Sequence, residues 1–354
     1  MKILCSMISV VDRSASTTKT GLLTASFLFA CALLLSACQP EEATRWQGGV
    51  MGTRYHITIT SDQPIAPGLE SQVAELLVSL DQRFTTYSEE SELMVLNRQP
   101  IGEPLQVSAE LYAVLSEAAE IYRLSDGAFD PTVGPLVELW GFGRAPSSGQ
   151  LPTDETIAAQ LERVGLQGLA LLDGQRAVRL APIAVDLSAI AKGYAVDAVA
   201  DLLDANALHD YMVEVGGELR LGGYNAQGSP WRIAIESPVQ FGQVERVVEV
   251  SDSAMATSGD YHNYFTVDGV RYSHTIDPRT GRPVPRGLVS VTVLAESSMR
   301  ADAMATALSV MGAEHGLALA EQLDLPVYLI SLRDGELVAQ SSRAFAPYLA
   351  PIQN

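Results

Sequence analysis

Alternating apolar and polar residues predict that the fold begins with a β-strand over residues 51–60. Tyr55, Ile57 and Ile59 fall on one face of this stretch, whereas His56, Thr58 and Thr60 fall on the other. A period of two is typical of a strand that has one buried face. We therefore expect this strand to pack against a hydrophobic core.

Three later segments have the spacing of amphipathic helices. In two of them, apolar residues recur three and four positions apart, namely Val73, Leu76, Leu77, Leu80 and Phe84, and then Leu111, Val114, Leu115, Ala118 and Tyr122. In the third, Thr153 can cap a helix that buries Ile157, Leu161 and Val164.

Turn signals divide much of the remaining chain into strands. Asp-Gly pairs at 173–174, 268–269 and 334–335 lie between strand-like runs and favour hairpin turns. A helix is expected from Ser298 to Met311, with Gly312 as its C-terminal cap. Helices and hairpins are interspersed without regular strand–helix alternation, which favours an α+β fold with largely antiparallel sheets and packed helices. We expect residues 50–354 to form this domain, with two lobes around a cleft.

The first 37 residues resemble a secretory signal peptide. Basic residues precede an uncharged apolar run over residues 21–37, which ends Leu-Ser-Ala before Cys38. This ending resembles a bacterial lipobox, so Cys38 would become the lipidated first residue, carrying palmitate, and residues 38–49 would form a polar tether. The expected location is the periplasmic side of the cell inner membrane. An uncleaved membrane anchor is the alternative, because about 20 apolar residues can span a bilayer, and Met7 is an alternative start.

Net charge and cysteine use exclude several classes of function. The chain has 354 residues, with 42 Asp and Glu against 23 Lys and Arg, and a formal net charge of −19. Nucleic-acid-binding proteins need a basic surface, so we expect no nucleic acid partner. All three cysteines lie in the first 38 residues, which excludes cysteine-based sites from the rest of the chain. The common phosphate-binding loops and hydrolase motifs are absent from the sequence.

Two segments place acidic and basic residues where a ligand could approach the backbone. Asp130 lies between glycines and before a proline, although an ordinary helix-to-loop turn is the alternative. Asp186 precedes a helix expected to begin near Ser188, and Lys192 lies close enough to that start to reach a bound anion. Capping by Asp186 and a surface lysine are the alternative at this position.

Two further features suggest metal binding and proton transfer. Asp302 and Thr306 are four residues apart and share one face of the expected helix. Their oxygens are hard ligands suited to Mg²⁺, although a buried Asp–Thr hydrogen bond is the alternative. His274 lies at the end of a strand before a tight turn, where it could accept a proton. An ordinary strand-end histidine is the alternative there.

Together and in this order, the segments resemble the ApbE family, the FAD:protein FMN transferases. The similarity runs from about residue 50 to about residue 312. The blocks that carry it are Met51-Gly-Thr-Arg-Tyr55, Thr86-Tyr87, Ser91-Glu-Leu, Leu96-Asn97, Gly127-Ala-Phe-Asp-Pro-Thr132, Val185-Asp-Leu-Ser-Ala-Ile-Ala-Lys-Gly-Tyr194, Gly216-Gly-Glu218, Thr257-Ser-Gly-Asp260, His274-Thr-Ile-Asp-Pro278, Thr280-Gly281 and Ala301-Asp-Ala-Met-Ala-Thr306.

The resemblance implies a set of site residues. Family members bind FAD with Mg²⁺ on its diphosphate, and the metal would be held by the backbone carbonyl of Ala189 and the side chains of Asp302 and Thr306. His274 would be the catalytic base. Members differ at the position of Lys192, where some have an acidic residue. The expected FAD contacts are Met51, Tyr87, Ala128, Phe129, Asp130, Asp186, Lys192, Ile276 and Ala305.

The resemblance also implies a reaction and its partners. The FMN moiety of FAD would be transferred to a Thr or Ser hydroxyl of an acceptor protein, forming a phosphoester and releasing AMP. The implied acceptors are subunits of membrane redox complexes of the sodium-pumping quinone reductase (Nqr) and Rnf types. An FAD pyrophosphatase, a non-catalytic flavin-binding lipoprotein and a periplasmic solute-binding lipoprotein are the alternatives.

Overall fold

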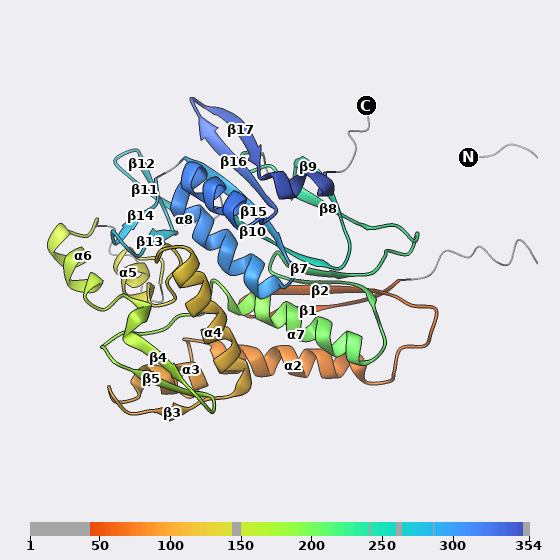
Figure 1. The fold of residues 1–354 in the computed structure, drawn as a ribbon, viewed down its shortest axis with the longest axis horizontal. Coiled ribbons are helices and arrows are strands. Elements are labelled where there is room, and N and C mark those ends of the chain that lie inside the picture. Colours follow the sequence, from red (N-terminus) through yellow and green to blue (C-terminus); the bar gives the residue numbers. More distant parts are fainter. Residues whose placement is uncertain (1–42, 144–149, 241, 260–263, 286, 350–354) are drawn as a thin grey trace, which may run out of the picture. The chain divides into compact units, whose positions relative to one another are not determined.

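A computed structural model describes residues 43–143, 150–240, 242–259, 264–285 and 287–349 (Figure 1). The predicted signal peptide, residues 1–37, and the predicted lipidation site Cys38 lie outside the described residues. The described residues form one compact unit, so the expected lobes belong to a single folded body. In the described part of the chain, no helix combines the length and the apolar character needed to cross a membrane.

An eight-stranded antiparallel sheet lies at the centre of this unit. The strand order is β1-β2-β6-β7-β10-β15-β16-β17, and each neighbouring pair is antiparallel. The prediction of an α+β fold with largely antiparallel sheet is therefore confirmed. The strands are β1 (Thr44–Val50), β2 (Thr53–Thr60), β6 (Asp210–Val215), β7 (Glu218–Gly222), β10 (Ser253–Gly259), β15 (Leu288–Ala295), β16 (Val327–Arg333) and β17 (Glu336–Ser341).

Helices cover one face of the main sheet (Figure 1). The long helices α7 (Ala191–Ala205) and α8 (Ser298–Gln322) pack on the strands, α2 (Leu69–Phe84) packs on α7, and α4 (Ala109–Leu124) packs on α8. The short helix α3 (Glu92–Arg98) follows α2. The main hydrophobic core lies between these helices and the sheet, which places α7 and α8 side by side.

Smaller elements complete the fold. On the opposite face, the ribbon β8 (Trp231–Glu236) and β9 (Val244–Val250) and the 3₁₀ helix η2 (Arg343–Tyr348) bury a second cluster around Trp231 and Phe345. A third cluster gathers around Trp140 from the segments α5 (Gly134–Leu139), α6 (Asp154–Leu161), β11 (Tyr264–Val267), β12 (Val270–Ser273) and β13 (Ile276–Asp277). Strand β14 (Arg282–Pro283) pairs with β13. The remaining elements are β3 (Leu105–Gln106), η1 (Leu166–Gly168), β4 (Leu169–Leu172) and β5 (Arg176–Arg179).

Most local predictions are confirmed. The three Asp-Gly pairs connect β4 to β5, β11 to β12 and β16 to β17. Thr153 caps α6, because its hydroxyl accepts a hydrogen bond from the backbone N–H of Thr156 at 3.2 Å. The helices predicted from apolar spacing correspond to α2 and α4, and the first predicted strand corresponds to β2.

Two local predictions need correction, and a third needs an addition. The tether predicted over residues 38–49 is shorter, because Thr44–Val50 forms β1 and buries Trp46 and Val50 against the core. The helix predicted from Ser298 to Met311 does stop at Gly312, which leaves helical geometry (φ 78°), but a second helical stretch that was not predicted follows directly and ends at Gln322. Helix α7 begins at Ala191, later than the predicted start near Ser188.

Helices α7 and α8 meet at Gly193. A Cβ atom at this position would lie 2.4 Å from the carbonyl oxygen of Ser298 and 2.6 Å from the Cα of Met299. Both are backbone atoms, so they cannot move aside without shifting the start of α8. Only glycine therefore allows the two helices to approach this closely.

We expect Gly193→Ala to lower the free energy of unfolding by about 2 kcal/mol, because overpacking at a rigid contact forces backbone shifts. Urea unfolding of the two proteins measures the difference. Gly287→Ala is the matched control, since a Cβ there meets nothing within 4 Å. An equal loss in both variants would contradict the steric explanation.

Candidate active site

A cleft of about 1130 Å³ opens beside the start of α7 and the first turns of α8. Its walls come from α3, α5, α6, the loop before α7, the end of β10 and the segment after β12. The structure brings most of the predicted site residues together here. Those that line the cleft are Tyr87, Asp186, Ala189, Lys192, His274, Ile276, Asp302 and Thr306.

The other predicted FAD contacts do not line the cleft. Ala128, Phe129 and Ala305 are at most 2 % exposed and belong to the packed interior. Met51 lies in the turn between β1 and β2, where its N–H donates to Asp81 Oδ2 at 3.2 Å. Their role as FAD contacts stays a prediction.

Asp130 is committed to contacts within the fold. Its Oδ1 accepts hydrogen bonds from the Thr132 N–H at 2.8 Å and the Thr132 hydroxyl at 2.6 Å, and its Oδ2 accepts one from the Leu166 N–H at 3.2 Å. Burial raises the pKa of Asp130, and these hydrogen bonds oppose that shift. The carboxylate therefore holds the turn after α4 against the segment at Leu166.

Asn97 holds the loop that leads into the cleft. Its side-chain amide donates to the Val185 carbonyl at 2.8 Å, and its carbonyl oxygen accepts from the Val185 N–H at 2.7 Å. Asp186 follows, and its carboxylate accepts from the Ser188 N–H at 2.8 Å. Asp186 therefore stabilises a turn before α7 and does not cap the helix itself. This turn presents Ala189 to the cleft.

Lys192 lies between two buried carboxylates. Its ammonium Nζ is 3.1 Å from Glu218 Oε1 and 3.7 Å from Asp302 Oδ2. The side chains of Glu218 and Asp302 are 7 % and 5 % exposed, against 25 % for Lys192. Burial lowers the pKa of Lys192, but the two carboxylates outweigh it and raise the pKa above its usual value.

Gly216 makes room for this lysine. A Cβ at Gly216 (φ +61°) would lie 2.8 Å from Thr53 Cγ2 and 3.2 Å from Lys192 Cδ. The stem of Lys192 therefore passes over backbone that carries no side chain. The glycine between β6 and β7 thus contributes to the site by its lack of a side chain.

Glu218 is the residue that sequence reasoning missed, since it appeared only as part of a Gly-Gly-Glu block. Its Oε2 is buried and has no hydrogen-bond partner among the described residues. In β7, Leu219 and Leu221 belong to the second cluster, so Glu218 and Arg220 share the face toward the helices. The pattern that could have predicted this is the alternation of Glu218 and Arg220 with two leucines along the strand.

We expect Glu218 to make stability depend on pH. Burial, reinforced by Asp302, raises the pKa of Glu218 to about 8. The folded protein then keeps a proton that the unfolded chain releases near pH 4.5, so this group's contribution to stability falls as pH rises between these values.

Glu218→Gln removes the titration, so the variant should gain stability relative to wild type from pH 5 to pH 8, on the order of 2 kcal/mol. Urea unfolding at several pH values measures this. Exposed Glu336→Gln is the control and should show no such trend. Parallel pH profiles for Glu218→Gln and wild type would contradict the prediction.

The donor set on α8 fits a magnesium ion. Asp302 and Thr306 both face the cleft, and the Thr306 hydroxyl lies 3.3 Å from that of Ser258 on β10. With the Ala189 backbone they offer carboxylate, hydroxyl and carbonyl oxygens, the ligands that Mg²⁺ prefers. Within the described ranges, no three His, Cys, Asp or Glu side chains group as a metal site, so the set is a mixed one.

His274 lies in the cleft wall contributed by the third cluster. It follows β12, and its ring packs edge-on to Phe142 with centroids 6.3 Å apart. The turn after it is anchored by Trp140, whose indole N–H donates to the Gly281 carbonyl at 2.8 Å and whose ring stacks on Tyr272. The strand-end position predicted for His274 is confirmed, and it faces the same cleft as Asp302.

The family model for ApbE matches residues 51–329. The chain belongs to the ApbE family. A relative from Vibrio cholerae, named FAD:protein FMN transferase, is 44 % identical over 90 % of this chain and 96 % of its own length. A relative of the same name from Haemophilus influenzae is 40 % identical over 89 % of this chain and 94 % of its own length. Another, from Escherichia coli, is 36 % identical over 92 % of this chain and 97 % of its own length.

Solved structures of ApbE proteins have the same fold. The flavin transferase ApbE from Vibrio cholerae has a TM-score of 0.82 at 44 % identity and covers 88 % of this chain and 100 % of its own. The apo form of the Pseudomonas stutzeri flavinyl transferase ApbE has a TM-score of 0.81 at 37 % identity, covering 88 % and 98 %. The ApbE resemblance seen in the sequence is therefore confirmed, and with it the fold class.

Proposed function

We propose that this protein transfers the FMN moiety of FAD to a threonine or serine hydroxyl of an acceptor protein. The observation that carries the proposal is that one cleft of an ApbE-family chain gathers Lys192, His274, Asp302 and Thr306. Relatives at 36–44 % identity over most of the chain are named for this activity.

The reaction is a phosphoryl-type transfer. The acceptor hydroxyl oxygen forms a bond to the phosphorus on the FMN side of the FAD diphosphate. The bond from that phosphorus to the bridging oxygen breaks, and AMP leaves with that oxygen. The acceptor then carries FMN as a phosphoester. In such reactions the protein contributes positioning and charge neutralisation.

His274 is assigned as the base that takes the proton from the acceptor hydroxyl. It lies in the cleft wall beside Phe142, next to the turn that Trp140 holds. Lys192 supplies a fixed positive charge for the diphosphate, since the neighbouring carboxylates keep it protonated. Tyr87, 74 % exposed, offers an aromatic surface at the cleft for a flavin ring.

Mg²⁺ would be held by the side chains of Asp302 and Thr306 and by the Ala189 carbonyl. When bound, it neutralises charge on the diphosphate and makes AMP a better leaving group. An acidic chain that handles an anionic cofactor needs this local positive charge. Asp186 and Ile276 also line the cleft and complete the part of the proposed FAD site that it contains.

We further propose that Cys38 carries a lipid that holds the protein at the periplasmic side of the inner membrane. The acceptors would then be subunits of membrane redox complexes of the Nqr and Rnf types. A shared membrane raises the effective concentration of enzyme and acceptor. Mass spectrometry of the mature N-terminus tests the lipidation.

The activity is tested with the full-length protein in detergent, FAD, Mg²⁺ and a threonine-bearing acceptor domain of a quinone reductase. AMP that appears only with acceptor, matched by flavin fluorescence on the denatured acceptor and abolished by EDTA, is the expected result. Equal AMP without acceptor and no labelled protein would replace the proposal with an FAD pyrophosphatase. Bound FAD with neither product would point to a non-catalytic flavin-binding protein.

A further inference from the structure

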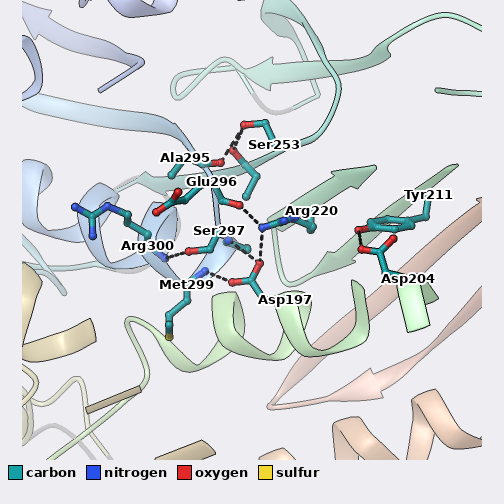
Figure 2. A network of polar contacts seen from close by, with 12 residues as sticks. Asp197, Asp204, Tyr211, Arg220, Ser253, Ala295, Glu296, Ser297, Met299 and Arg300 are labelled. Atoms are coloured by element: carbon teal, nitrogen blue, oxygen red, sulfur yellow. Dashed lines mark hydrogen bonds and ion pairs between the residues drawn. The ribbon is translucent and has the colours of Figure 1, made fainter. Parts of the chain in front are cut away.

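Asp197 bridges the two helices that carry the site. It lies on α7, and its Oδ1 and Oδ2 accept hydrogen bonds from the backbone N–H groups of Ser298 and Met299, each at 2.8 Å (Figure 2). These are the first two residues of α8, whose N–H groups have no partner within the helix. One carboxylate thus binds two free amides of a neighbouring helix.

Helix α8 already has a cap of its own. The Ser297 hydroxyl accepts from the Arg300 N–H at 3.2 Å, the usual arrangement at a helix start (Figure 2). The contacts of Asp197 therefore do more than cap the helix. They fix where the start of α8 lies along α7.

The same crossing continues toward the cleft. One turn before Asp197, the Gly193 N–H donates to Asp302 Oδ2 at 3.2 Å, in the backbone contact described above. One turn after Ser298 on α8 lie Asp302 and then Thr306. The two helices are thus joined at two points. The second contact is made by Asp302, whose carboxylate is assigned to the metal site.

Arg220 completes the bridge from the sheet. Its guanidinium lies 3.4 Å from Asp197 Oδ1 and also donates to the Glu296 carbonyl (Figure 2). Burial raises the pKa of Asp197 to about 6, while the amides and Arg220 oppose the shift. A carboxylate only 15 % exposed and held by three donors from two other elements is a rigid link between α7, α8 and β7.

We propose that Asp197 is a positioning residue for the metal site, which sets Asp302 and Thr306 at the correct place opposite the Ala189 carbonyl. The proposal rests on the metal-dependent function proposed above. Residues that orient metal ligands in this way typically change metal affinity when they are replaced, without touching the metal.

The test measures Mn²⁺ binding to the full-length protein at 25 °C by electron paramagnetic resonance, in the absence of FAD. Asp197→Asn should weaken Mn²⁺ binding by about 10-fold. Ser297→Ala is the matched control, because it removes the ordinary cap of α8 and leaves the bridge in place. It should lower the midpoint of thermal unfolding but bind Mn²⁺ as wild type does. Exposed Asp201→Asn, one turn along α7, controls for charge.

Mn²⁺ binding by Asp197→Asn equal to wild type would overturn the positioning role. Equal losses in Asp197→Asn and Ser297→Ala would overturn it too, since any weakened helix start would then suffice. If wild type binds no Mn²⁺, the metal site itself fails, which is a distinguishable result. If Asp197→Asn does not fold, Arg220→Gln takes its place, with a smaller loss of affinity expected because both amide contacts remain.

Discussion

Replacing Asp302 with asparagine is expected to reduce AMP release by roughly 10³-fold or more at saturating FAD, because the anionic oxygen of the proposed metal site is lost. The amide keeps the size of the side chain and can still accept the Gly193 N–H, so the α7–α8 contact should survive. AMP release measured against Mg²⁺ concentration gives the effect. Higher Mg²⁺ should restore part of the rate.

Two controls separate the loss of a ligand from damage to the fold. Asp201→Asn, exposed on α7, should leave AMP release unchanged. The Asp302→Asn variant should unfold at a temperature close to that of the metal-free wild type. A rate within a few-fold of wild type, with unchanged Mg²⁺ dependence, would remove Asp302 from the metal site.

His274→Ala should lower AMP release and acceptor labelling by about 10²–10⁴-fold, the usual contribution of a general base. FAD affinity, measured by quenching of flavin fluorescence, should change only a few-fold, because His274 is assigned to the acceptor proton and not to the cofactor. Its position after β12 leaves the core clusters intact.

His315→Ala, at an exposed position on α8, is the matched control for His274→Ala. Retained labelling in His274→Ala would contradict its role as base. Loss of FAD binding together with activity would instead make His274 a cofactor contact. A rise in acceptor-independent AMP would show that water can replace the acceptor hydroxyl in the variant.

Local features of the fold could be predicted because they are encoded over a few residues. Asp-Gly pairs specify tight hairpin turns, and apolar spacing specifies which helix face is buried. Strand β1 was missed because its sequence, Thr-Arg-Trp-Gln-Gly-Gly-Val, has few apolar residues and two glycines. It forms because β2 offers an edge to pair with and a core that Trp46 can cover.

The candidate site was predictable only in part for a related reason. Asp302 and Thr306 share a helix face, so their proximity follows from spacing alone. The approach of Glu218 to Lys192 depends on β7 lying beneath α7, which no short pattern encodes. Asp130 was expected at a ligand, but its carboxylate is used by Thr132 and Leu166, and the second of these partners is distant in sequence.

The charges around the Lys192 ammonium have a consequence for how the cation and the flavin nucleotide affect each other's binding. Lys192, Glu218 and Asp302 together are neutral while Glu218 keeps its proton, and they carry one surplus negative charge once that proton leaves. A phosphate-bearing ligand alone would add to that surplus, whereas a divalent cation alone would overcompensate it. Joint entry keeps the cleft near electroneutrality. Cation and flavin nucleotide should therefore bind with positive linkage, each tightening the other by the same factor.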